Sequence, residues 1–193
     1  MKLALDKSNM LSLLMDFPSQ LKRALDIAKG IRPLKGGRAV SNIVFSGLGG
    51  SAIGGDVVRC CLAEELRIPL VVNRDYEIPR FVDSGTLFFA SSYSGNTEET
   101  LSAYKQARKK RARIVVLTGG GQLRAMARKD GYPVAQIPDN TMPPRCALGY
   151  SFIPFLTILS NINLIKDKAG EVNEAAGVIA GLRDKTTAPS VPF

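Results

Sequence analysis

The sequence contains no histidine and no tryptophan, and only three cysteines among its 193 residues. Without histidine the chain alone cannot build a Ser-His-Asp or Cys-His catalytic site, and it lacks the commonest ligand of protein-bound metals. Cys60 and Cys61 are adjacent and Cys146 stands apart, so no pair has the spacing of metal ligands. We expect reduced thiols, no metal, no cofactor and a cytoplasmic location.

Long hydrophobic runs are missing as well. The most apolar segment, residues 152–165, is too short to cross a bilayer and contains Pro154 and Asn161. The N-terminal residues 1–17 are interrupted by charged side chains, and no small-residue cleavage site follows them. We therefore expect neither a signal peptide nor a membrane partner.

Acidic residues are outnumbered: 17 Asp and Glu stand against 26 Lys and Arg, which gives a net charge of +9. Much of the excess lies in segment 108–113 and in Arg124, Arg128 and Lys129. No aromatic residues alternate with these cations, as a base-stacking surface would require. Cations near helix C-termini complement the helix dipole, so we expect solvated helix ends and no nucleic-acid partner.

Five short apolar runs alternate with helical patterns along the chain. The runs that predict buried strands are residues 42–46, 68–73, 86–91, 113–118 and 133–137. The segments that predict helices are residues 8–30, 51–66, 97–111, 121–129, 143–165 and 171–183. Continuously apolar strands separated by helices predict an α/β protein with a doubly wound parallel sheet of about five strands, flavodoxin-like, with helices on both faces.

The pattern divides the chain into three parts. Residues 1–40 form an N-terminal helical segment, and residues 41–165 form the ligand-binding domain. Residues 166–193 add one helix and a segment with the composition of an interdomain linker. We expect the apolar helices 8–30 and 143–165 to be exposed and to pair with another domain or a second copy.

Two loops rich in small residues each join a predicted strand to a predicted helix. The first covers residues 46–56 (SGLGGSAIGGD) and the second residues 91–100 (SSYSGNTEET). Backbone N–H groups at a helix N-terminus bind anions, so each loop predicts a site for a phosphate. Both loops follow parallel strands and are therefore expected at the same edge of the sheet, where such folds bind ligands.

The second loop offers three hydroxyls within one turn: Ser92, Ser94 and Thr97. Asn96 is a candidate N-cap, and Glu99 would complete a capping-box-like pair with it. That cap would leave the serines free for a ligand. Glu98 and Glu99 would compete with a phosphate at this helix end unless they point away from the loop.

Three segments in order resemble the sugar isomerase (SIS) domain family and, within it, the bifunctional phosphoglucose/phosphomannose isomerases. They are Gly47–Asp56, Ser92–Leu101 and Pro144–Leu148 (PRCAL). The resemblance implies an aldose–ketose isomerisation that interconverts glucose 6-phosphate or mannose 6-phosphate with fructose 6-phosphate through a cis-enediol. It also implies a homodimer, or a second SIS domain that would supply the base and a histidine and that is absent from this sequence.

The resemblance assigns roles to single positions. Those that would bind phosphate are Ser92, Ser94 and Thr97, and those that would lie along the sugar are Gly49, Gly50 and Ser51. Arg145 would stabilise the enediolate. The sequence around Arg145 agrees with this role, because a guanidinium between prolines and an apolar helix is a fixed cation that can stabilise developing negative charge. The alternative for Arg145 is an ion pair with Asp139.

Two other functions stay open. A stand-alone SIS domain could sense a phosphosugar without converting it. The first loop also matches the dinucleotide pattern as Gly47-x-Gly49-x-x-Ala52, with Asp75 near the end of the next strand as the ribose ligand. A dinucleotide site would leave the three hydroxyls of the second loop unexplained.

Overall fold

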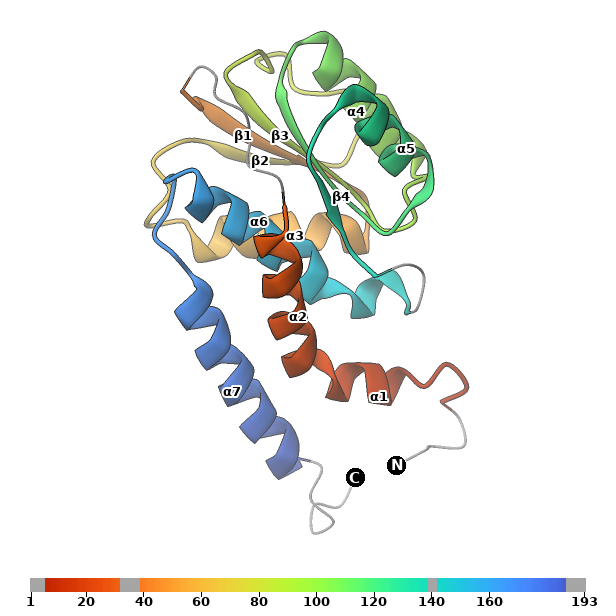
Figure 1. Ribbon diagram of the computed structural model, residues 1–193, viewed down its shortest axis with the longest axis vertical. Helices are drawn as coiled ribbons and strands as arrows, with labels where there is room; N and C mark the ends of the chain where they lie inside the picture. The colour runs from red at the N-terminus through yellow and green to blue at the C-terminus, as the bar shows by residue number, and fades with distance from the viewer. Residues whose placement is uncertain (1–5, 32–38, 139–141, 187–193) are drawn as a thin grey trace.

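A five-stranded, entirely parallel sheet forms the centre of the molecule, in the order β2-β1-β3-β4-β5 (Figure 1). The structure, a computed structural model, describes residues 6–31, 39–138 and 142–186. The strands are β1 (Asn42–Ser46), β2 (Leu70–Asn73), β3 (Thr86–Ser92), β4 (Arg113–Thr118) and β5 (Val134–Gln136). The predicted doubly wound sheet is thereby confirmed.

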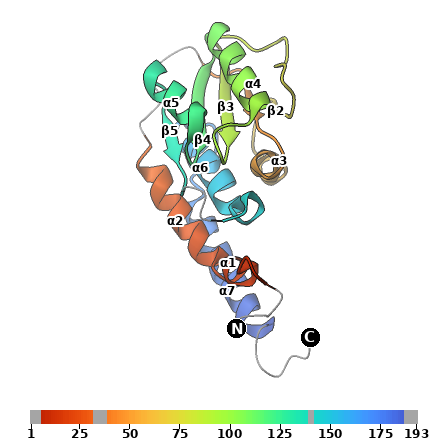
Figure 2. The same cartoon turned by 90° about the vertical axis from the view of Figure 1, so that its right-hand side faces the viewer.

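Helices cover both faces of the sheet, as continuously apolar strands require. One face packs against α4 (Glu98–Lys109) and α5 (Gly121–Asp130), around Phe88 and Val116. The other face packs against α3 (Gly50–Cys61) and α6 (Leu148–Asn161). There the ring of Phe155 lies 4.9 Å from that of Phe45 and 4.3 Å from that of Phe89, between centroids. Figure 1 shows α4 and α5 on one side of the strands and α3 and α6 on the other, and Figure 2 gives the view from the side of α4 and α5.

The N-terminal segment forms two helices, where the sequence predicted one. They are α1 (Met10–Met15) and α2 (Phe17–Lys29), and they meet at Asp16. Pro18 lies in the first turn of α2, where its missing N–H costs nothing, and Gly30 follows the last turn. Helix α2 packs on α6 and on α7 (Ala169–Thr186), so α2 and α7, which are far apart in the sequence, lie side by side below the sheet (Figure 1).

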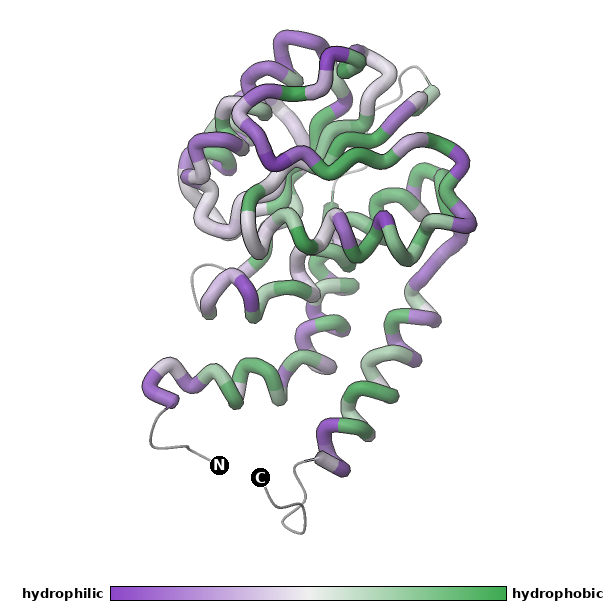
Figure 3. Tube along the Cα trace, turned by 180° about the vertical axis from the view of Figure 1, so that it is seen from behind, coloured by the Kyte–Doolittle hydropathy of each residue, from purple (hydrophilic) through white to green (hydrophobic). Residues whose placement is uncertain are grey.

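The predicted helix 143–165 is divided too. A 3-10 turn, η1 (Pro144–Cys146), precedes α6, and α6 continues through Pro154. Most of α6 is buried beneath α2 and α3, and the apolar segments gather in the interior (Figure 3). The expectation of an exposed apolar helix that awaits a partner is therefore wrong for 143–165, because helices of the same chain cover it.

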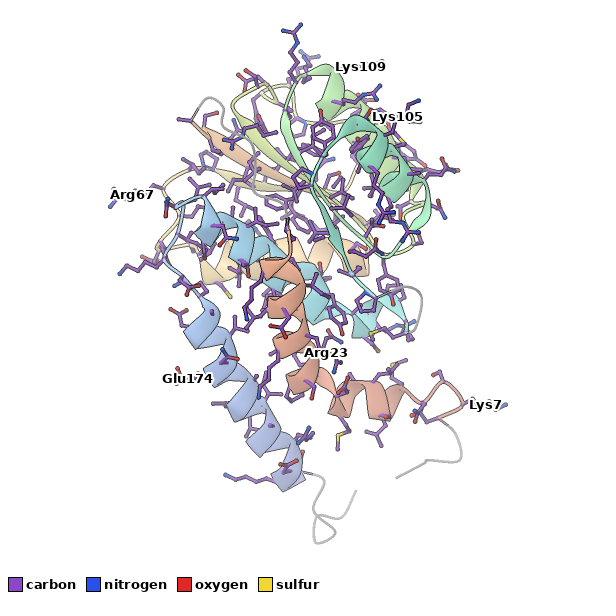
Figure 4. The ribbon with its side chains drawn as sticks, in the orientation of Figure 1. Lys7, Arg23, Arg67, Lys105, Lys109 and Glu174 are labelled. Carbon is purple, nitrogen blue, oxygen red and sulfur yellow. The ribbon has the colours of Figure 1, made fainter. Side chains whose placement is uncertain are left out.

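Two further expectations concern helix ends. Helix α3 stops at Cys61, short of the predicted Leu66, and Glu65 in the following turn pairs with Lys168 at 2.8 Å. Arg108 and Lys109 lie in the last turn of α4, and Arg128 and Lys129 lie in the last turn of α5, as expected for helix ends, whereas Arg113 begins β4. Figure 4 shows Lys109 at the outer end of the molecule, far from α7.

Within the described ranges, no helix is long and apolar enough to span a membrane. The predicted linker after residue 186 falls outside the described residues, as does Asp139.

Candidate functional site

The loops after β1 and β3 form one unit at the carboxyl edge of the sheet. Their strands are neighbours, with Ser46 opposite Ala90 in the parallel register. The backbone N–H of Tyr93, in the second loop, donates a hydrogen bond to Ser51 Oγ, in the first turn of α3, at 3.1 Å. The hydroxyl of Ser51 therefore joins the first predicted phosphate loop to the second.

The first loop also contacts the turn that carries Arg145. Gly49 has a positive φ of 53° and precedes α3, a conformation that favours glycine. A Cβ on Gly50 would stand 3.3 Å from the carbonyl carbon of Pro144 and 3.4 Å from the nitrogen of Arg145. The absence of a side chain at Gly50 thus lets η1 lie directly against the first turn of α3.

Within the second loop, the hydroxyl oxygens of Ser92 and Thr97 lie 2.8 Å apart. Ser92 Oγ also accepts the N–H of Gly95 at 3.1 Å, and the side chain is almost fully buried. Ser94 is exposed and its Oγ accepts the N–H of Asn96 at 3.2 Å. Hydroxyl protons rotate freely, so Ser94 and Thr97 can donate to an arriving anion while Ser92 orients Thr97 from below.

The predicted capping pair of Asn96 and Glu99 is wrong. Thr97 is the N-cap residue of α4, and within the described chain no side chain caps that end. Asn96 instead accepts the N–H of Gln122, in the first turn of α5, at 3.0 Å. The first N–H groups of α4 therefore stay available to an anion.

Gly95 explains why Asn96 turns to α5. It has a positive φ of 73°, and a Cβ there would stand only 1.8 Å from the carbonyl oxygen of Gly120. The loop after β3 consequently packs against the loop after β4, with Leu123 N–H donating to the Gly95 carbonyl at 2.9 Å. This long-range contact carries Asn96 away from its own helix.

The acidic side chains of the first turn of α4 do not have to face the anion site. Tyr76, in the segment after β2, donates its hydroxyl to Glu98 Oε2 at 3.3 Å. Burial and the carboxylates of Glu99 and Glu98 raise the pKa of Tyr76, so the hydroxyl keeps its proton and remains a donor. The contact turns Glu98 towards Tyr76 and reduces its competition with a bound phosphate.

Arg145 is exposed on η1, and the structure gives it no hydrogen bond or ion pair to another described residue. The alternative pairing with Asp139 involves a residue outside the described ranges. Within those ranges, no three Cys, Asp or Glu side chains gather as metal ligands. Asp75, the ribose ligand of the dinucleotide alternative, accepts the N–H of Tyr76 at 2.6 Å.

One supporting residue was not predicted from the sequence. Gln20 of α2 is 1% exposed, and its amide contacts the backbone on both sides of the turn between η1 and α6. The only local indication of this role in the sequence is that Gln20 is a polar residue on the apolar face of a helix, four positions before Ala24. Nothing in that pattern indicates a contact more than a hundred residues away.

Comparison with known proteins gives consistent results. Residues 38–134 match the SIS domain family. The bifunctional phosphoglucose/phosphomannose isomerase of Caldicellulosiruptor bescii is 45% identical over 177 residues, which cover 92% of this chain and 52% of the relative. The enzyme of the same name from Thermoplasma acidophilum is 38% identical over 173 residues, covering 90% and 51%.

Among solved structures, a hypothetical protein from Thermus thermophilus superposes with a TM-score of 0.65 at 22% identity, covering 96% of this chain and 46% of that one. This likeness concerns the fold. The chain spans about half the length of the curated relatives it matches. On the family match and the two glycine- and serine-rich loops, the chain belongs to the SIS domain family.

Proposed function

We propose that this chain is the phosphosugar-binding part of an aldose–ketose isomerase that interconverts glucose 6-phosphate or mannose 6-phosphate with fructose 6-phosphate. The observation that carries the proposal is the contact between Gly50 and the backbone of Pro144 and Arg145. Through it, the turn of Arg145 lies at the N-terminus of α3, and the hydrogen bond from Tyr93 to Ser51 joins the loop of hydroxyls to the same helix turn. The isomerases of this name among the relatives support the choice of substrate.

The phosphate would bind at the second loop. Ser94 and Thr97 would donate their hydroxyls, the uncapped N–H groups of α4 would complete the anion site, and Ser92 would hold Thr97 in place. The sugar would extend along Gly49, Gly50 and Ser51 towards Arg145.

Arg145 would act at the reacting end of the sugar. Proton transfer between C1 and C2 of the open-chain sugar passes through a cis-enediolate, which carries negative charge on oxygen. A guanidinium held nearby by the backbone stabilises that charge more than it stabilises the neutral substrate, and this difference lowers the barrier. We assign ring opening and the C2 proton transfer to a histidine and a carboxylate of a second SIS domain or a second chain.

We further propose residues 41–165 as the phosphosugar-binding domain, with residues 1–40 and 166–193 flanking it. The protein would act in the cytoplasm, where its free cysteines stay reduced, and would pair with a second copy or a second SIS domain. Sedimentation at micromolar concentration tests the homodimer, and a monomer there would contradict it.

A phosphosugar-sensing role without turnover is the second candidate, because the sequence supplies no histidine for ring opening. The dinucleotide alternative receives less support. The backbone of Pro144 and Arg145 narrows the space over the first turn of α3, where a pyrophosphate would lie.

Thermal unfolding with fructose 6-phosphate or NADH tests these alternatives. At about 100 times its dissociation constant, a ligand adds roughly 2.7 kcal/mol and raises the midpoint by a few degrees. We expect a shift with the sugar phosphate and none with NADH. A shift with NADH alone would overturn the proposal. Transfer of the C2 proton to solvent, followed by NMR on the chain joined to the second SIS domain that would supply the base, then separates an isomerase from a sensor.

A further inference from the structure

Gln20, on α2, contacts the backbone of the residues that follow Arg145. Its Nε2 donates to the carbonyl of Cys146 at 2.7 Å, and its Oε1 accepts the N–H of Gly149 at 2.7 Å. Both groups of the amide are therefore used, and both contacts are buried. Cys146 directly follows Arg145 in the sequence.

The N–H of Gly149 belongs to the first turn of α6, where the helix itself offers no acceptor. Gln20 thus caps α6 from another helix. Gly149 also leaves room for the amide, because a Cβ there would stand 2.8 Å from Gln20 Oε1. An apolar residue in place of Gln20 would leave both the Cys146 carbonyl and the Gly149 N–H without their partner.

A second contact holds the same two helices together. Arg23, which is labelled in Figure 4, lies one turn after Gln20. Its Nε donates to the hydroxyl of Tyr150 at 2.9 Å, and its guanidinium pairs with Asp16. The hydrogen bonds to Asp16 and to Tyr150 raise the pKa of Arg23, which stays charged. The start of α6 is consequently fixed to α2 at two successive residues.

Two helices therefore contact the turn that carries Arg145. The first turn of α3 contacts it through Gly50, and α2 holds the next residues through Gln20. Neither α2 nor Arg145 lies within residues 38–134, the part of the chain that matches the SIS family.

We propose that Gln20 is a positioning residue of the phosphosugar site: it fixes the turn of Arg145 against α3, and the preference of the site for a negatively charged reacting end depends on it. The inference rests on the proposed function of Arg145. A charge-assisted contact loses strength when its geometry loosens. A small displacement of the turn is therefore sufficient to weaken the preference for a negatively charged reacting end.

Two probes isolate this effect. Both 6-phosphogluconate and sorbitol 6-phosphate carry the phosphate at C6, but the first has a carboxylate at C1 and the second a neutral hydroxyl. We expect the wild-type chain to bind the carboxylate more tightly by about tenfold or more, measured by calorimetry. Gln20→Met keeps the side-chain volume. In this variant the ratio of the affinities for 6-phosphogluconate and sorbitol 6-phosphate should fall about tenfold, and sorbitol 6-phosphate should bind nearly as before.

Gly149→Ala adds a Cβ that displaces the amide of Gln20. It serves as the second test variant if Gln20→Met does not fold. The matched control is Tyr104→Phe, which removes a 2.7 Å hydrogen bond to Asp130, between α4 and the end of α5. It should lower stability and leave the ratio unchanged.

A Gln20→Met or Gly149→Ala chain that keeps the full ratio while its melting temperature falls overturns the inference and leaves the proposed function standing. A wild-type chain that binds neither probe overturns the proposed function itself, and this inference with it. A wild-type chain that binds both probes equally overturns the role of Arg145 and therefore that of Gln20.

Discussion

The hydroxyl of Ser51 and the backbone N–H of Tyr93 lie 3.1 Å apart and join the two loops of the site. A ligand that spans both loops needs their spacing to be fixed before it binds. Ser51→Ala removes the acceptor, so the affinity for fructose 6-phosphate should fall about fivefold to tenfold. Calorimetric titration measures it, with Ser12→Ala on the exposed face of α1 as the control. An unchanged affinity would show that the loops keep their spacing without this bond.

The second prediction concerns the phosphate loop. Thr97→Val keeps the shape of the side chain and removes the hydroxyl, so inorganic phosphate should bind about tenfold more weakly. Thr100 lies one turn further along α4, and its hydroxyl donates to the Ser91 carbonyl inside the protein. Thr100→Val is therefore the matched control: it should lower the melting temperature without changing phosphate affinity. Equal losses in the two variants would contradict a phosphate site at Thr97.

The third prediction tests whether Tyr76 draws Glu98 away from the anion. In Tyr76→Phe the carboxylate is released, and phosphate should bind about twofold to threefold more weakly. Glu98→Gln removes the charge and should strengthen binding by a similar factor. If Tyr76 acts only through Glu98, the double variant should bind like Glu98→Gln alone. Additive effects of the two substitutions would exclude this coupling.

The fourth prediction concerns acid stability. The hydrogen bond from Tyr104 and the pairing with Arg108 lower the pKa of Asp130 below that of an unfolded chain. A carboxylate with a lowered pKa stabilises the fold above its unfolded pKa, and this contribution is lost as the pH falls through its folded pKa.

The stability difference between wild type and Asp130→Asn should therefore be largest near pH 6 and shrink as the pH falls below about 4. Urea denaturation across that range measures the difference. A difference that stays constant with pH would contradict the lowered pKa of Asp130.

Much of the fold followed from local patterns. The runs 42–46 and 113–118 became β1 and β4 with unchanged limits, because a continuously apolar run of that length between polar turns has few alternatives. The break between α1 and α2, and that between η1 and α6, were missed. Each break lies beside a proline inside an otherwise helical pattern. Pro18 lies in the first turn of α2, and Pro144, which follows another proline, begins η1.

The site was predictable where it depends on sequence spacing and unpredictable where it depends on distant contacts. The hydroxyls after β3 were evident from the chain, and Ser92 and Thr97 do lie within hydrogen-bond distance. The partner of Asn96 was not, since Gln122 reaches it only through the close approach of two loops. The same holds for Gln20, whose two contacts lie in η1 and in α6, at Cys146 and Gly149.

The most direct test of the central claim is a crystal structure of this chain with fructose 6-phosphate. We expect the phosphate oxygens to lie about 2.7–3.0 Å from the hydroxyls of Ser94 and Thr97, with the C1–C2 end of the sugar facing Arg145. A phosphosugar bound elsewhere on the molecule, or one whose phosphate pairs with Arg145 while the loop after β3 stays empty, would contradict it.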